Sequence, residues 1–106
     1  MVDSVQYYVY ILANERHTVF YIGMTSNLQQ RMYQHSNGIF DGFTKKYNIH
    51  KLLYYEIHGD INETIKREKV LKKWNKDWKW ALIDKYNPTR KNLYQNFDIE
   101  SLPFEE

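Results

Sequence analysis

The chain has 106 residues, with 15 lysine and arginine residues against 13 aspartate and glutamate residues, and so a formal net charge of +2 at pH 7. This length supports one modest hydrophobic core, and the absence of cysteine excludes disulfides, thiolate metal sites and a cysteine nucleophile. No apolar run approaches the length of a membrane span, so we expect a cytoplasmic protein without a membrane partner.

The first third of the chain predicts a β-hairpin. Residues 6–13 are rich in Tyr, Val and Ile, residues 14–18 form a polar turn, and residues 19–23 are a second β-favouring run. Ser26 has Gln29 three residues later, a capping-box pattern that predicts a helix reaching to about His35.

The remainder predicts one more strand and two helices. Residues 52–58 have strand composition, and Asp60 with Glu63 forms a second capping box that opens a helix over residues 61–74. A shorter helix, marked by the spacing of Trp78, Ala81, Leu82 and Lys85, ends before Pro88. Beyond it we expect three apolar residues to pack back onto the domain: Leu93, Tyr94 and Phe97.

The order β-β-α-β-α-α indicates an α+β fold, with a small, mainly antiparallel three-stranded sheet and helices packed against it. We expect a single domain over residues 5–94, followed by an acidic C-terminal tail over residues 95–106.

Basic residues concentrate in the predicted helices. Seven of them lie between positions 66 and 79, where Glu68 and Asp77 are the acidic residues: Lys66, Arg67, Lys69, Lys72, Lys73, Lys76 and Lys79. Such a run is ordinarily a solvated helix face, and the alternative is a surface for nucleic acid.

Glu68 is the least expected residue of this region. On a helix it projects from the same side as Ile61, Ile65 and Leu71. A buried, unpaired carboxylate there would cost roughly 3 to 5 kcal/mol. Glu68 must therefore pair with a cation or lie at the floor of a cleft.

Several short motifs occur in a specific order along the chain. Tyr8-Val9-Tyr10 precedes Tyr21-Ile22-Gly23, an arginine and a histidine follow on the next predicted helix, and Arg67-Glu68-Lys69 comes later, with Asn87 before Pro88. In order and spacing this pattern resembles the GIY-YIG nuclease superfamily, and most of all its small single-domain bacterial members related to the nuclease module of the excision-repair excinuclease. Two departures are Tyr8, in place of the first glycine, and Met24, where some relatives carry a lysine.

The resemblance implies a phosphodiester-cleaving site made of five catalytic residues: Tyr10, Tyr21, Arg31, His35 and Glu68. It also gives Gly23 and Asn87 supporting places. Independently of it, Arg31 offers a planar, permanently charged fork for a phosphate, and Glu68 can anchor Mg²⁺ or Mn²⁺. Either Tyr10 or His35 could take the proton from water, with Tyr21 positioning that water.

Taken singly, each of these residues has an ordinary structural explanation. The tyrosines are strand aromatics, Arg31 is a solvated helix residue, His35 lies at a helix C-terminus, and Glu68 could form an ion pair with Arg31 or Lys72. Their joint occurrence favours function.

The leading hypothesis is a metal-dependent DNA endonuclease that nicks or selects particular structures, in repair or recombination. It would hold nucleic acid through four lysines: Lys45, Lys46, Lys72 and Lys73. A homodimer or a targeting partner protein could supply selectivity. The alternatives are a nucleic-acid-binding module of the same fold with little turnover, and a protein-interaction domain.

Overall fold

The computed structural model describes residues 5–36 and 46–96. Three antiparallel strands form an open sheet in the order β2-β1-β3: β1 (Tyr7–Ala13), β2 (Phe20–Thr25) and β3 (Lys51–His58). The central strand β1 is completely buried from Tyr8 to Ala13, which suits its unbroken run of aromatic and aliphatic side chains. The α+β prediction and the strand order along the chain are confirmed.

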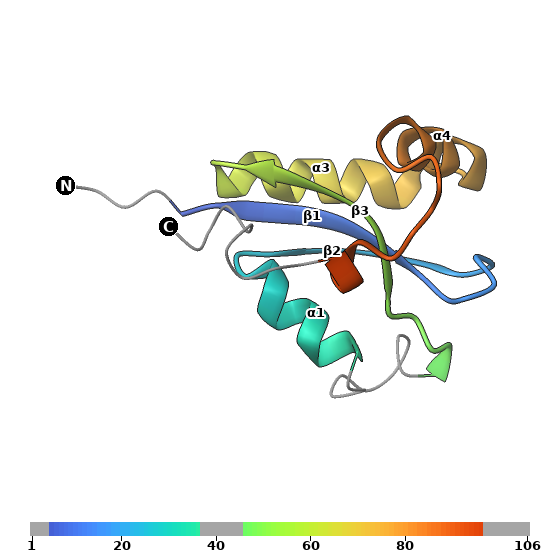
Figure 1. Ribbon diagram of the computed structural model, residues 1–106. Coiled ribbons are helices and arrows are strands. Elements are labelled where there is room, and N and C mark those ends of the chain that lie inside the picture. The colour runs from blue at the N-terminus through green and yellow to red at the C-terminus, as the bar shows by residue number, and fades with distance from the viewer. Residues whose placement is uncertain (1–4, 37–45, 97–106) are drawn as a thin grey trace.

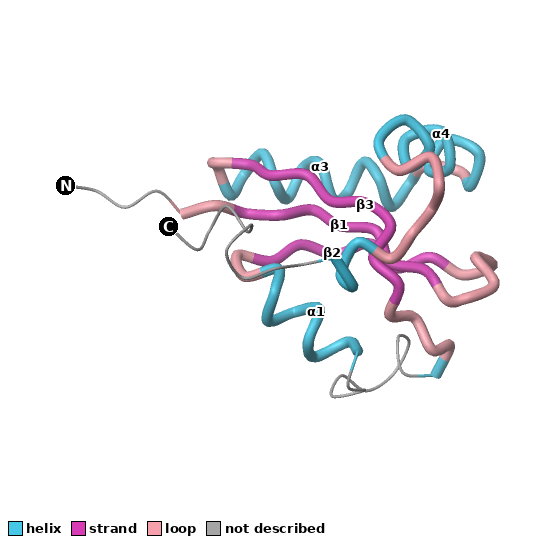
Figure 2. The backbone as a smooth tube through the Cα atoms, in the orientation of Figure 1, coloured by secondary structure: helices cyan, strands magenta, loops and turns pink. Residues whose placement is uncertain are grey.

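Helices cover both faces of this sheet (Figure 1). One face carries α1 (Leu28–Ser36), and the other carries α3 (Ile61–Lys73) and α4 (Lys76–Tyr86). The short 3-10 helix η1 (Leu93–Asn96) lies against β3 (Figure 2). Leu93 and Tyr94 pack on the core as predicted. Phe97, Lys45 and the acidic residues of the predicted tail lie outside the described residues.

Alternation along β1 divides the core into two halves. Tyr8, Tyr10 and Leu12 point to the α1 side, where they meet Leu28 and Met32. The intervening side chains of β1 point to the other side and form the second half with helices α3 and α4. The helices α1 and α3, with the side chains that they carry, therefore belong to opposite layers of the molecule.

The start of α1 differs from the prediction. The side chain of Asn27, rather than that of Ser26, caps the helix by accepting the Gln30 N–H at 3.1 Å. The reason is that β2 continues to Thr25, whose hydroxyl oxygen accepts the Asn27 N–H at 3.0 Å. Asn and Ser are equally good caps, so the length of the preceding strand decided between them.

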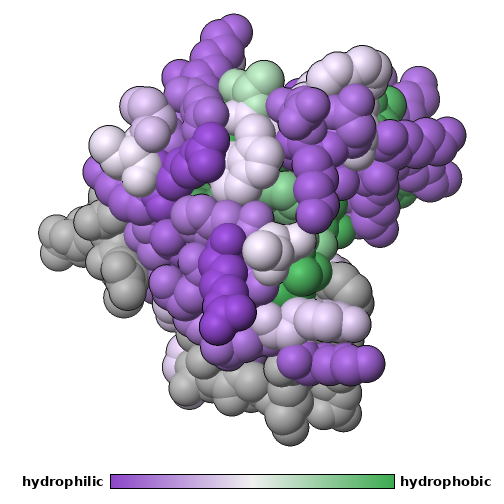
Figure 3. Space-filling view, turned by 90° about the vertical axis from the view of Figure 1, so that its right-hand side faces the viewer, coloured by the Kyte–Doolittle hydropathy of each residue, from purple (hydrophilic) through white to green (hydrophobic). Residues whose placement is uncertain are grey.

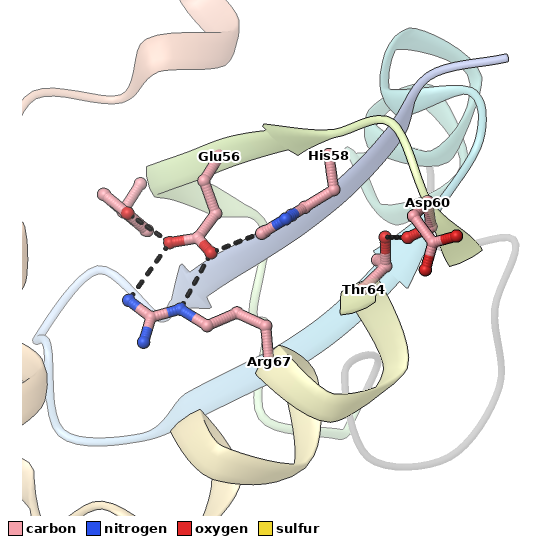
Figure 4. A network of polar contacts seen from close by, with 6 residues as sticks. Glu56, His58, Asp60, Thr64 and Arg67 are labelled. Atoms are coloured by element: carbon pink, nitrogen blue, oxygen red, sulfur yellow. Dashed lines mark hydrogen bonds and ion pairs between the residues drawn. The ribbon is translucent and has the colours of Figure 1, made fainter. Parts of the chain in front are cut away.

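The predicted cap of α3 is confirmed, because the Asp60 carboxylate accepts the Glu63 N–H at 2.9 Å. The buried stripe is different: Thr64 and Leu71 are buried, whereas Ile61 is 44% exposed at the first position of the helix. The Thr64 hydroxyl donates to the Asp60 carbonyl at 2.7 Å, which satisfies it in the core (Figure 4).

Helix α4 is present, but the spacing that predicted it marks its outer face. Ile83 is its buried residue, while Trp78, Ala81 and Lys85 are exposed and line a shallow apolar groove together with Trp74 and Leu82. Across the described ranges, the helices are all too short or too polar to cross a membrane.

Candidate nuclease site

Three aromatic side chains meet on the α1 side of the sheet. The ring centroids of Tyr10 and Tyr21 are 6.3 Å apart, and the His35 ring lies 6.1 Å from Tyr10 and 5.6 Å from Tyr21. The two tyrosines come from paired strands and His35 from the last turn of α1. Four of the five predicted catalytic residues lie here, because Arg31 on α1 acts electrostatically on both Tyr10 and His35.

Gly23 explains how the tyrosines fit. It is the register partner of Tyr10, and a Cβ atom at this position would lie 2.5 Å from Tyr10 Oη and 3.1 Å from a ring carbon of Tyr21. The Tyr10 phenol therefore lies directly across the backbone of β2. The supporting role expected for Gly23 is a close approach of side chains to the strand.

Tyr10 is a protonated phenol in the free protein. Burial raises its pKa well above 10, the nearby Tyr21 adds to this rise, and the Arg31 guanidinium opposes it. Its buried hydroxyl makes no hydrogen bond of regular geometry to any described residue. A buried phenol of this kind has donor and acceptor capacity for an incoming ligand.

His35 is neutral at pH 7. Burial and the positive charge of Arg31 lower its pKa from 6.5 to about 4. Its exposed fraction is 7%. The site therefore combines one permanent cation with one imidazole that has been kept uncharged beside it.

Glu68 approaches from the other layer. It is on α3, which packs against β2, β1 and β3, and its side chain is 17% exposed. Its carboxylate is close enough to contribute to the raised pKa of Tyr10, as the weakest of the contributing groups. The Glu68 carboxylate therefore interacts electrostatically with the Tyr10 phenol, although the two residues come from different layers of the molecule.

The ion pair of Glu68 is with Lys72, whose Nζ lies 3.3 Å from Oε2. Lys72 is one turn further along α3 and its side chain is 54% exposed. Of the two cations considered from the sequence, Lys72 is therefore the one for which the structure gives an ion pair. The ion pair between Glu68 and this exposed lysine is weak, since surface ion pairs contribute about 0 to 1 kcal/mol to stability.

A half-buried polar network ties α3 to β3 (Figure 4). Glu56 on β3 accepts hydrogen bonds from Arg67 Nε at 2.8 Å and from the Tyr54 hydroxyl, and lies 2.8 Å from His58 Nε2. Burial alone would raise the pKa of Glu56, but the hydrogen bonds, led by that of Arg67, hold it below its usual value. This network could not be predicted from the sequence, since Arg67 lies eleven positions from Glu56 and joins it only through the packing of α3 on β3.

The side chain of Asn87 makes hydrogen bonds at the end of α4. Its buried side chain donates to the carbonyls of Leu53 at 3.0 Å and Lys91 at 2.9 Å, and so ties the end of α4 to β3. Of the lysines predicted to hold nucleic acid, Lys46, Lys72 and Lys73 are exposed.

The GIY-YIG catalytic domain family matches residues 6–92. The chain belongs to this nuclease family. It is 30% identical over 92 residues to a UPF0213 protein of Clostridium perfringens (strain 13 / Type A), covering 87% of this chain and 98% of that relative. A UPF0213 protein of Syntrophus aciditrophicus (strain SB) is 36% identical over 84 residues, 78% of this chain and 94% of the relative.

A solved structure shares the fold. The solution NMR structure of a UPF0213 protein from Bacillus halodurans has a TM-score of 0.53 and 22% identity, covering 83% of this chain and 93% of that one. The GIY-YIG resemblance drawn from the motifs is therefore confirmed.

Proposed function

We propose that this protein is a divalent-metal-dependent endonuclease that hydrolyses phosphodiester bonds in DNA, by nicking or at particular structures, in repair or recombination. The observation that carries the proposal is the group of Tyr10, Tyr21 and His35 around Gly23, with Arg31 beside it and Glu68 within electrostatic reach. Membership of the GIY-YIG family supports a nucleic acid substrate.

Glu68 is the residue that would hold the metal. The described residues contain no group of three histidine or acidic side chains that could form a complete protein cage. Mg²⁺ does not need one, because it keeps several waters and takes phosphate oxygens of the substrate as ligands. A single, largely buried carboxylate whose ion-pair partner among the described residues is an exposed lysine fits this requirement, and Mn²⁺ accepts the same oxygen donors. When bound, the ion would polarise the phosphate and stabilise the departing oxygen.

Arg31 would bind the phosphate. Its guanidinium has paired N–H donors, and it stays protonated and positively charged over the pH range of any activity assay. Burial, together with this charge, lowers the pKa of His35 and keeps it neutral at pH 7, so Arg31 would bind the anion without a second, titrating cation beside it.

The two candidate proton acceptors differ in the pH that they require. His35 is in its acceptor form above a pH of about 4, so it would give a rate that is flat through neutral pH. Tyr10 must first lose its own proton, and would give a rate that rises into the alkaline range. The other member of the pair and Tyr21 would hold the attacking water by hydrogen bonds.

A nicking assay on supercoiled plasmid tests the proposal. The wild-type chain should convert supercoiled plasmid to open circles only when Mg²⁺ or Mn²⁺ is added, and Glu68→Ala should abolish the conversion. Glu63→Ala is the matched control, because Glu63 is an exposed glutamate on the same helix, paired loosely with Lys66 at 4.0 Å. This control should cleave at the wild-type rate.

Glu68→Ala should remain folded. Lys72, the cation that it leaves behind, is exposed, so the free energy of unfolding should change by less than about 1 kcal/mol. A folded Glu68→Ala variant that still nicks would remove the metal anchor from the proposal. DNA binding by the wild-type chain without metal-dependent cleavage would favour the second candidate, a nucleic-acid-binding module, which the Glu68–Lys72 pair supports by giving Glu68 a structural partner.

A further inference from the structure

A second group of basic side chains gathers at the turn between β1 and β2. Lys51 Nζ lies 3.0 Å from His17 Nε2, and Lys76 Nζ donates to the Thr18 carbonyl at 2.9 Å. These contacts bring the start of β3 and the start of α4 to the same turn. They involve the hairpin end of the sheet, and none of the five proposed catalytic residues takes part.

Two aromatic rings hold further cations at this place. The Arg90 guanidinium carbon lies 3.9 Å from the centroid of the Trp80 ring, and Lys79 Nζ lies 5.9 Å from that of Phe20. The two rings contact each other at 4.9 Å, and the His17 ring lies 5.4 Å from Trp80. Phe20 and Trp80 pack on the core half that faces α3 and α4, opposite the side of Tyr10.

Hydrogen bonds within the turn between β1 and β2 hold its conformation. The Asn14 side-chain oxygen accepts the N–H groups of Thr18 at 2.8 Å and Val19 at 3.1 Å, and its amide nitrogen donates to the Thr18 hydroxyl. The backbone N–H of His17 donates to the Asn14 carbonyl at 3.0 Å. His17 is therefore held on an ordered turn, and Lys51 and Lys76 contact that turn from β3 and α4.

Backbone strain falls on the same residues. His17 has φ 58° and Arg90 has φ 54°, in the left-handed region that favours glycine and asparagine. They are two of the three non-glycine residues with positive φ in the described ranges. Such strain persists where the surrounding structure enforces it, and it gathers at functional sites.

Three lysines of this cluster form no ion pair with a described residue: Lys51, Lys76 and Lys79. Both carboxylate oxygens of Asp84 accept hydrogen bonds from Arg90, from Nε and from Nη2, each at 2.8 Å. Around His17 the charged groups are Lys51 and Arg90, which with burial lower its pKa, and Glu15, which opposes them. Burial and Lys76 likewise lower the pKa of Lys79. Figure 3 shows that the face carrying this turn is mostly hydrophilic, with only small apolar areas.

We propose that the hairpin turn, through His17, Lys51, Lys76 and Lys79, is a second nucleic-acid contact that binds backbone phosphates outside the cleavage site. A phosphate there would relieve the mutual repulsion of the cations and accept hydrogen bonds from the lysines and the imidazole. This inference rests on the proposed function in taking nucleic acid as the ligand, but it does not require cleavage.

Binding of a short DNA duplex, measured without divalent ions, tests the proposal. The double variant Lys51→Gln/Lys76→Gln should bind roughly tenfold more weakly, and the slope of log affinity against log salt should become less steep by about 2, since each lost phosphate contact removes about 0.9. Lys85→Gln is the control, because Lys85 is an exposed lysine on the same helix that lines the apolar groove instead. It should leave affinity and slope unchanged.

Equal weakening by Lys85→Gln, or an unchanged slope in the double variant, would overturn the proposal. Because no metal is present, a chain that fails to cleave DNA can still pass this test, and a cleaving chain can fail it.

Nuclear magnetic resonance titration of His17 gives a second readout. Its pKa should rise when the duplex is added, because a phosphate favours the charged imidazole. His17→Asn should weaken binding without unfolding the protein, since asparagine tolerates the left-handed backbone. An equal rise in pKa with a polyglutamate peptide would indicate an acidic protein partner and would contradict the nucleic-acid assignment.

Discussion

Tyr10 has two properties that ordinarily conflict. It lies in the middle of the most buried strand, as a core residue would, yet its hydroxyl makes no regular hydrogen bond within the part of the chain that the structure describes. Burying a hydroxyl without a partner costs about 1 to 3 kcal/mol in proteins. Packing alone therefore does not explain a hydroxyl group at this position.

Tyr10→Phe should separate these two roles. The free energy of unfolding of the variant should lie within about 1 kcal/mol of the wild-type value, because the hydroxyl that is removed makes no regular hydrogen bond and interacts with the Arg31 guanidinium alone among the described cations nearby. Its nicking rate should fall by roughly 100-fold or more, within the usual range for loss of a proton-transfer group. Chemical denaturation beside the plasmid assay measures both. A destabilised but active Tyr10→Phe protein would make the hydroxyl structural.

His35 should make stability depend on pH. Its pKa is about 4 in the folded protein and 6.5 in the unfolded chain, so the unfolded chain binds more protons between these values. The stabilisation is complete above pH 6.5 and is lost as pH falls to 4, by up to about 3 kcal/mol. Denaturation curves of the wild type and His35→Gln across this range check it. Parallel pH dependence in the two proteins would show that other groups are responsible.

At the scale of elements, the pairing of β1 with β2 places the site. Because Tyr10 and Gly23 are register partners, the absence of a side chain on one strand makes room for the phenol of the other. A shift of one residue in register would send Tyr10 to the α3 side of the sheet. Tyr10 and Gly23, which come from the two different motifs, therefore pack against each other as a pair.

Gly23→Ala should therefore damage both folding and activity. The new methyl group would meet Tyr10 Oη at 2.5 Å and the adjacent ring carbon at 2.7 Å, so the phenol must move. Overpacking of this kind costs about 1 to 3 kcal/mol, and the nicking rate should fall with it. Gly59→Ala is the control, since a Cβ atom there has nothing within 4 Å. Thermal melts in which the two variants are equally stable would contradict this account of Gly23.

At the scale of the whole molecule, the metal should serve chemistry and not folding. The described residues hold no cluster of three potential ligands, and the two halves of the core pack without one. Removal of divalent ions with EDTA should abolish nicking and leave the melting temperature unchanged. Added Mg²⁺ should restore activity. A large fall in melting temperature with EDTA would mean that an ion stabilises the fold itself.

The sequence by itself determined the elements and the family. Strand composition, turn residues and the Asp60 cap are local signals, and they were sufficient to predict the three strands and the helices α1, α3 and α4 with small errors in their bounds, whereas the 3-10 helix η1 was not predicted. The motif residues Tyr10, Tyr21, Arg31, His35 and Glu68 could also be selected in advance, because their order along the chain is itself informative. The Asn27 cap was missed because it depends on where β2 ends.

Only the tertiary structure decided how these residues meet. Which face of β1 carries Tyr10, the burial that keeps His35 neutral, and the pairing of Glu68 with Lys72 all depend on packing between layers. The basic cluster at the hairpin turn was likewise invisible, since it joins His17, Lys51 and Lys76 from distant parts of the chain. Local sequence carries periodicity and capping, whereas charge balance and burial arise only when separate elements come together in space.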